Sequence, residues 1–300
     1  MDIGAQVQPK LVADDTFRDY DEKTSKRAAV VHDHYKQMRS AQSFAFVEEM
    51  EKRWLHLATA KMNIRSCFDL LKAYVDTSDP DTELPNMIHM LQTAEAIRAG
   101  GEPDWMILIG LIHDLGKAMC LIGKYTAEER KSFGQLGTAE GPQYALGGDT
   151  WVVGAPLPDC NVLPQYNSLN PDKEHPIYSS SPLGMYKEGC GMMNLKYAFG
   201  HDEYIYHVVK RHQENVPTAE RIPLEGLAML RLHSCYPWHF GGAYKQFMAK
   251  DGSDDKLLAS VKSFQKYDLY TKRDLPPSVD ILWPYYQSLI DRFLPGDLSF

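Results

Sequence analysis

The sequence predicts an all-α protein with a single helical domain. Over most of the chain, apolar residues recur at spacings of three and four, as they do on the buried face of an amphipathic helix. Runs of β-branched residues are few, and no segment alternates apolar and polar residues as a strand would. There is also no internal repeat and no low-complexity tract. These observations together favour a helical bundle.

The first helical region covers residues 28–74. A loop rich in Asp and Pro (DTSDPDTELP) follows it at 76–85. The next helix is expected at about 86–99, where the pair Gly100-Gly101 closes it. The apolar spacing within the first region is carried by Phe44, Phe46, Val47, Met50, Trp54 and Leu55.

A further helix should start at Glu102-Pro103-Asp104, with proline in its first turn, and continue to about Ile122. Residues 124–190 have little periodicity and many Gly, Pro, Asn, Asp and Ser residues, so we expect a long irregular connection, which is often functional. Residues 1–27 are polar and predict a poorly ordered or lid-like segment before one domain at 28–300. The remaining helices are expected at about 192–212, 223–234, 253–271 and 279–293.

Composition and charge narrow the function classes. The 300 residues are 44% hydrophobic and 24% charged, as in ordinary globular proteins. A net charge of −8 argues against nucleic acid or an anionic membrane as the main partner. The longest apolar stretch, 105–112, is too short to span a bilayer. Five cysteines without CxxC spacing and an N-terminus without an apolar leader predict reduced thiols and a cytoplasmic location.

Four histidines stand among apolar neighbours in four expected helices. One such histidine is usually an ordinary core residue. Four are harder to explain in this way, because each buried imidazole needs a polar partner. A shared metal would supply that partner. The four histidines are His89, His113, His201 and His233.

Two carboxylates complete the candidate cluster. Asp114 follows His113 directly and lies about ten residues inside its expected helix, so a helix cap is a poor explanation for it. Asp268 lies between aromatic residues, although a pair with Lys272 one turn away is also possible. Neighbouring helix residues point about 100° apart, so a tandem His-Asp suits two metals, with the carboxylate bridging them. Nitrogen and oxygen ligands without thiolate suit iron, manganese, zinc or nickel.

Two lysines each follow a candidate ligand by four residues. Lys117 follows His113, and Lys272 follows Asp268. On a helix, each lysine would lie one turn from the ligand. The ordinary interpretation is a salt bridge or a lysine that reaches solvent. Next to a metal cluster, we favour a positive group that holds a substrate oxygen.

The tandem His113-Asp114, with a histidine upstream and an aspartate far downstream, resembles the HD-domain superfamily. Longer strings resemble the myo-inositol oxygenase family, in the same order, from about residue 17 to the end. Their number makes the resemblance specific, although residues 124–140 form a longer stretch than the family leads us to expect and Cys235 replaces an aromatic residue. The strings are SDPD (78–81), PNMIHMLQTAE (85–95), GLIHDLGK (110–117), GGDT (147–150), LGMY (183–186), GHDEY (200–204), HSCYPWH (233–239), YDLYTK (267–272) and WPYYQSLID (283–291).

The resemblance implies an HD-type helical fold around a mixed-valent Fe(II)/Fe(III) non-haem di-iron centre. One iron would be held by His89, His113 and Asp268, the other by His201 and His233, and Asp114 would bridge them. It also implies that Lys117 and Asp114 act in catalysis. The implied substrate contacts are Arg18, Asp76, Thr77, Ser78, Lys117, Gly148, Asp149, His233, Ser234 and Lys272.

The implied reaction is the four-electron, ring-cleaving oxidation of myo-inositol by O2 to D-glucuronate, which requires a redox-active metal. A neutral polyol is recognised by many buried donors and acceptors, and Asp76, Ser78, Asp149 and Ser234 would supply them. We expect a monomer whose partners are small molecules. The main alternative is a divalent-metal HD-domain phosphohydrolase, which would release phosphate without consuming O2. A non-catalytic HD-like interaction domain would have a degraded ligand set, whereas all six positions are filled here.

Overall fold

The computed structural model describes residues 20, 26–81, 83–122, 147–268 and 278–300. The described chain is mainly helical, which confirms the predicted all-α class. Its only sheet pairs two strands of two residues each, β1 (Lys61–Met62) and β2 (Leu298–Ser299), in antiparallel register. The helices are α1 (Ala28–Ala41), α2 (Phe44–Trp54), α3 (Ile64–Leu70), α4 (Asn86–Ala99), α5 (Asp104–Ile112), α7 (His201–His212), α8 (Leu224–Leu232), α9 (Tyr236–His239), α10 (Ser253–Asp268) and α11 (Val279–Phe293).

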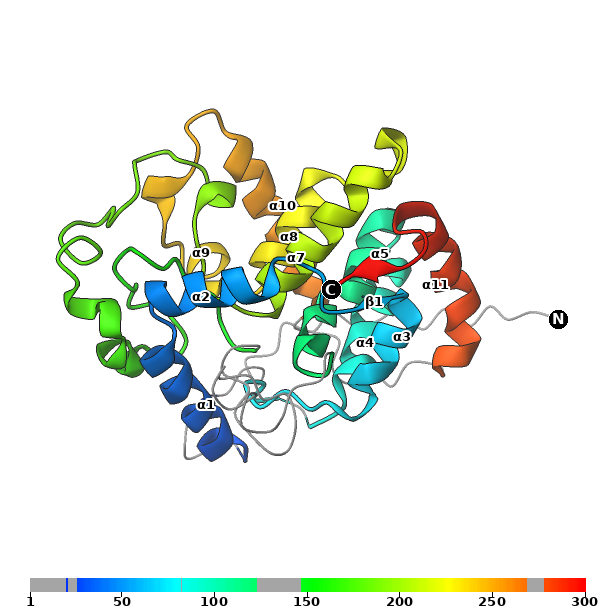
Figure 1. The fold of residues 1–300 in the computed structure, drawn as a ribbon, viewed down its shortest axis with the longest axis horizontal. Helices are drawn as coiled ribbons and strands as arrows, with labels where there is room; N and C mark the ends of the chain where they lie inside the picture. The colour runs from blue at the N-terminus through cyan, green and yellow to red at the C-terminus, as the bar shows by residue number, and fades with distance from the viewer. Residues whose placement is uncertain (1–19, 21–25, 82, 123–146, 269–277) are drawn as a thin grey trace.

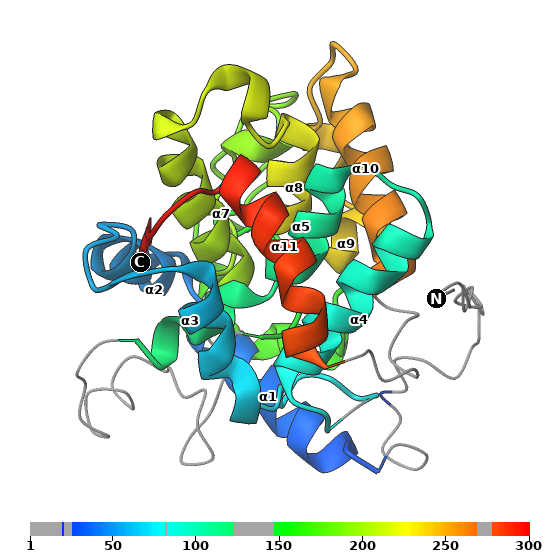
Figure 2. The ribbon, with the colours of Figure 1, turned by 90° about the vertical axis from the view of Figure 1, so that its right-hand side faces the viewer.

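The centre of the bundle is formed by α4, α5, α7, α8 and α10, which pack against one another in pairs (Figure 1). α4 packs along α5, and α8 packs against both α7 and α10. α11 covers the outer side of α5, as Figure 2 shows. α1 and α2 lie on the opposite side of the molecule from α11 (Figure 1). This arrangement brings together the ends of helices that are far apart in the sequence.

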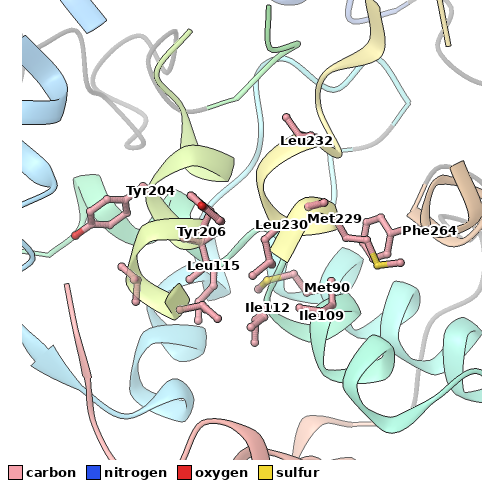
Figure 3. Packing of buried hydrophobic residues seen from close by; sticks show 14 of the residues in the cluster. Met90, Ile109, Ile112, Leu115, Tyr204, Tyr206, Met229, Leu230, Leu232 and Phe264 are labelled. Carbon is pink, nitrogen blue, oxygen red and sulfur yellow. The ribbon is translucent and has the colours of Figure 1, made fainter. Parts of the chain in front are cut away.

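α5 is the most deeply buried helix, since every residue from Met106 to Ile112 is buried. Its long apolar run is therefore a core helix, and no described helix is both long and apolar enough to cross a membrane. Figure 3 shows side chains from the central helices packed together in the core. They include Met90 of α4, Ile109 and Ile112 of α5, Met229 and Leu230 of α8, and Phe264 of α10.

Helix boundaries agree with the sequence where a clear signal exists. α4 and α11 have the predicted bounds. The helix expected to continue to about Ile122 is wrong, because α5 ends at Ile112 and a 3₁₀ helix follows at Leu115–Cys120. The helix expected from about residue 192 is also wrong at its start, because α7 begins at His201. Both discrepancies occur where a histidine enters the cluster described below.

The described part of the long connection, 147–190, is irregular as predicted and contains only the short 3₁₀ helices Pro164–Leu169 and Pro171–Glu174. Its remainder at 123–146 lies outside the described residues, and so does most of the expected N-terminal lid. Within that segment only Tyr20, Lys26 and Arg27 are described. Tyr20 packs edge-on against Tyr35 of α1, with 5.9 Å between the ring centroids.

Gly116 lies against the backbone where α7 begins. A Cβ atom added to it would lie 2.0 Å from the carbonyl oxygen of His201, closer than any real contact. We expect Gly116→Ala to push the Leu115–Cys120 segment away from α7 and to lower the free energy of unfolding by about 1–3 kcal/mol. Denaturant unfolding of the metal-free protein measures this change. Equal stability of the variant and the wild type would show that this close approach is not required.

Candidate metal centre

The six predicted ligands meet at the ends of the central helices. His89 lies within the first turns of α4, and His201 is the first residue of α7. His233 directly follows α8, and Asp268 ends α10. His113 and Asp114 directly follow α5, so the expectation that Asp114 lies deep inside a helix is wrong. The break in the helix frees these two neighbours to face different partners.

Asp114 divides its two carboxylate oxygens between two pairs of histidines. Its Oδ2 lies 3.8 Å from Nε2 of His89 and 3.6 Å from Nε2 of His113. Its Oδ1 lies 3.0 Å from Nε2 of His201 and 3.8 Å from Nε2 of His233. In each of these two groups, the ligand atoms lie within 4.8 Å of one another. The carboxylate is therefore placed to serve two ions.

Asp268 adds a second carboxylate to one of the two groups. Its Oδ1 lies 2.9 Å from Nε2 of His89 and 3.2 Å from Nε2 of His113. The structure thus brings together all six side chains in the grouping that the resemblance implies.

The imidazole tautomers fit metal ions. Nδ1 of His113 lies 2.8 Å from the carbonyl oxygen of Gly110, and Nδ1 of His233 lies 3.0 Å from that of Leu230. Because a carbonyl only accepts, each Nδ1 donates, which leaves Nε2 as the nitrogen that would bind a metal. These Nε2 atoms face further imidazole nitrogens, 3.3 Å away on His89 and 2.9 Å away on His201. Four imidazole nitrogens this close to one another and to carboxylate oxygens form a donor set that metal ions could share.

Both carboxylates remain ionised despite their burial. Burial alone would raise the pKa of Asp114, but Lys117 and the surrounding imidazoles hold it well below its ordinary value. Burial would also raise the pKa of Asp268, but His113 and His89 outweigh this effect. The pKa of Asp268 is therefore also well below its ordinary value. Ionised carboxylates and neutral imidazoles are the protonation states that bind a metal.

Lys117 is buried, so the interpretation as a lysine reaching solvent is excluded. Its Nζ lies 2.8 Å from Oδ2 of Asp114 and 2.7 Å from Oδ2 of Asp76, and it donates to Oδ1 of Asn86 at 3.1 Å. Burial lowers the pKa of Lys117, but the two carboxylates outweigh burial and raise it. The ammonium therefore stays charged and connects Asp114 with the loop at residue 76.

A polar pocket opens onto the cluster. The side chain of Asp76 accepts the hydroxyl of Ser78 at 2.6 Å, and that hydroxyl accepts the backbone N–H of Gly148 at 2.8 Å. Asp76, Ser78, Lys117, Gly148, His233 and Ser234 from the predicted substrate contacts all line this pocket, together with the other five ligands. Asn86, Tyr35 and Tyr236 also line it, and the sequence did not indicate them.

The other predicted substrate contacts are placed differently. Both oxygens of Asp149 bind the guanidinium of Arg39, at 2.9 and 2.8 Å, and both side chains are fully buried. Asp149 is not among the described residues that line the pocket. The hydroxyl of Thr77 lies 2.9 Å from Nδ1 of His34. Arg18 and Lys272 lie outside the described residues.

A helical bundle with four imidazoles and two carboxylates around an internal polar pocket is typical of a metal-dependent enzyme. The family model that matches this chain, over residues 28–300, is that of myo-inositol oxygenase. The chain is 39% identical to inositol oxygenase 1 of Arabidopsis thaliana over 285 residues, which cover 95% of this chain and 84% of the relative. It is 38% identical to inositol oxygenase of Mus musculus over 297 residues, which cover 98% and 94%. The chain belongs to the myo-inositol oxygenase family, which confirms the resemblance.

Proposed function

We propose that this enzyme converts myo-inositol and O2 to D-glucuronate, water and one proton at a dinuclear iron centre. The ring loses four electrons as one C–C bond breaks, and O2 takes up all four. One of its oxygen atoms enters the product, and the other leaves as water. The observation that carries this proposal is the carboxylate of Asp114, whose two oxygens face two separate pairs of imidazoles.

In this proposal His89, His113 and Asp268 hold one ion, His201 and His233 hold the other, and Asp114 bridges. Two bound iron ions would supply the redox chemistry with O2 and the acidification of a coordinated hydroxyl. Zinc would fill the same ligands but would not support the oxidation. The nitrogen and oxygen donors suit iron, and no described cysteine belongs to either group of ligands.

The polar pocket would recognise the ring by hydrogen bonds. Asp76, Ser78 and Ser234 offer acceptors and hydroxyl groups at its wall. Lys117 would donate from Nζ to a substrate oxygen in place of one of its present acceptors, and would stabilise negative charge when that hydroxyl loses its proton. Asp149 would act by holding Gly148 at the wall, because its own oxygens bind Arg39. Thr77, Arg18 and Lys272 remain proposed substrate contacts. We also propose that residues 1–27 form an N-terminal segment and that residues 28–300 form the catalytic domain.

A phosphohydrolase fits the pocket less well. The described lining residues include no arginine, and the lysine at the wall is already paired with two carboxylates. A phosphoester would bring more negative charge to a wall that carries Asp76, Asp114 and Asp268. A non-catalytic role is not favoured either, because the ligand set is complete.

Oxygen uptake tests the proposed function directly. We expect the iron-loaded protein to consume one O2 for each D-glucuronate formed from myo-inositol. The metal-free and zinc-loaded proteins should consume none, and a panel of phosphoesters should release no phosphate. Phosphate release without oxygen uptake would replace this proposal with the phosphohydrolase.

We propose further that the enzyme is a cytoplasmic monomer. The exposed Cys160 and the partly exposed Cys190 are free thiols, as expected in a reducing compartment. Light scattering during size-exclusion chromatography would show a mass near 34.1 kDa if the monomer is right and about twice that for a dimer.

Lys272→Ala should weaken substrate binding. If the ammonium holds a hydroxyl throughout the reaction, its loss should raise KM at least about tenfold and leave kcat nearly unchanged. Steady-state kinetics with the iron content measured in parallel would show this. Lys256→Ala removes an exposed lysine of α10 and serves as the control. An unchanged KM in Lys272→Ala would leave that residue as an ordinary ion-pair partner.

A further inference from the structure

The backbone carbonyl of His233 is held by two buried side chains. Nε2 of Gln265 donates to its oxygen at 2.7 Å, and Nε2 of His239 lies 2.9 Å from the same oxygen. A carbonyl only accepts, so His239 carries its proton on Nε2 here. Gln265 is 6% exposed and His239 is 5% exposed. Two N–H donors therefore converge on one peptide oxygen in the interior of the protein.

The peptide that joins His233 to Ser234 lies in the turn after α8, between a predicted metal ligand and a residue of the pocket wall. α8 ends at Leu232, and His233 is its C-cap residue, with helical backbone angles and its N–H bonded to the carbonyl of Met229. The imidazole of His233 faces Asp114, while the next residue, Ser234, lines the pocket. The carbonyl of Ser234 in turn accepts the N–H of Thr150 at 2.7 Å. Rotation of the His233 carbonyl would therefore change the directions of both His233 and Ser234.

Gln265 also belongs to the helix that supplies a ligand to the other group. It precedes Asp268 by three residues on α10, so the two side chains lie on neighbouring positions of one helix face. Phe264 packs against both His113 and His233, with ring centroids 5.4 and 6.2 Å apart. The amide of Gln265 thus fixes α10, which supplies Asp268, to the turn that carries His233.

We propose that Gln265 and His239 are positioning residues for the metal centre. Neither lines the pocket, and both act through the His233 carbonyl. Together they orient the His233 imidazole toward its ion and the Ser234 hydroxyl toward the substrate. The inference rests on the proposed metal centre. Loss of a group that orients a metal ligand typically weakens metal binding about 10- to 100-fold.

Mn(II) binding to the metal-free protein tests the proposal without any turnover, because electron paramagnetic resonance distinguishes free from bound Mn(II). The wild type should bind two ions. Gln265→Leu and His239→Leu should each weaken one of the two about 10-fold or more. His239→Gln keeps a donor N–H and should restore most of the affinity. In iron-loaded protein, Gln265→Leu should also raise KM for myo-inositol, because Ser234 is displaced.

Gln213→Leu is the matched control, since Gln213 is a buried amide outside the site. It should change the thermal midpoint but leave Mn(II) affinity unchanged. Gln265→Glu keeps the size of the side chain and places an oxygen where Nε2 donates, so it should also lower Mn(II) affinity. It replaces the leucine variant if that variant does not fold. Wild-type Mn(II) affinity in folded Gln265→Glu and His239→Leu would overturn the positioning role, even if their stability falls. A wild type that binds fewer than two ions would instead count against the proposed centre.

Discussion

Asp114→Ala should lose both metal ions. Each carboxylate oxygen faces one pair of imidazoles, so one substitution removes a ligand from both groups. We expect fewer than one ion per chain and a fall in kcat/KM of at least about 1,000-fold, which corresponds to about 4 kcal/mol of transition-state stabilisation. Metal analysis after gel filtration, together with oxygen uptake, measures both effects.

Two variants show whether this result comes from the bridge itself. His201→Ala removes a ligand from one group only, so it should keep the ion that His89, His113 and Asp268 hold. Asp254→Ala removes a buried carboxylate that caps the backbone N–H groups of Met192 and Ala249, outside the centre. It should lose stability and keep both ions. Retention of both ions in Asp114→Ala would rule out the bridging role.

Lys117→Met should reduce both stability and activity. Its ammonium separates the carboxylates of Asp76 and Asp114, and its removal leaves them buried without their cation. Breaking a buried ion pair in this way costs about 3–5 kcal/mol of unfolding free energy. Loss of a charge-assisted hydrogen bond to the substrate, worth about 1.5–3 kcal/mol, should lower kcat at least about tenfold with iron retained. Lys72→Met, at a largely exposed lysine paired with Asp69, is the control.

The pH dependence of stability gives a second measurement on the same variant. Burial would raise the pKa of Asp76, but Lys117 and His34 hold it below its ordinary value. A carboxylate with a lowered folded-state pKa adds stability above its unfolded pKa of about 3.9 and loses it as the pH falls through the folded value. In metal-free Lys117→Met the folded-state pKa of Asp76 should rise toward or above its unfolded value, because burial is no longer outweighed, so this loss of stability at low pH should become smaller or change sign. If the variant has full activity, full iron content and an unchanged pH profile, Lys117 is an ordinary salt-bridge residue.

The sequence predicted helices well where it contains its own boundaries. Pro85 and Gly100 enclose α4, and α11 carries a strong apolar stripe, so both were found with their bounds. The end of α5 was missed because apolar residues resume after His113-Asp114, at Leu115, Ala118 and Met119, and no proline marks a break. That end depends on tertiary structure, since His113 turns back to the Gly110 carbonyl and Gly116 fits against α7.

The ligands were predictable because their residue types are unusual in apolar helices, whereas their supporting residues were not. In the sequence, Asn86 is an ordinary polar residue at the start of a helix, yet in the structure it accepts a hydrogen bond from Lys117. From the sequence, Arg39 would be expected on the surface of α1. In the structure its guanidinium donates to both oxygens of Asp149, which is 110 residues away in the chain. Such pairs are formed by packing between distant segments, and no spacing along the chain indicates them.

The ligand atoms come from five separate stretches of chain between His89 and Asp268. An unfolded chain cannot hold them together, so ions at the proposed centre would bind the folded state more tightly, and metal binding and folding would be thermodynamically linked. At a concentration one hundred times its Kd, each ion would stabilise the folded state by about 2.7 kcal/mol. The proposed centre would therefore act as a reversible cross-link of the bundle. Metal scarcity should reduce the amount of folded protein as well as its activity.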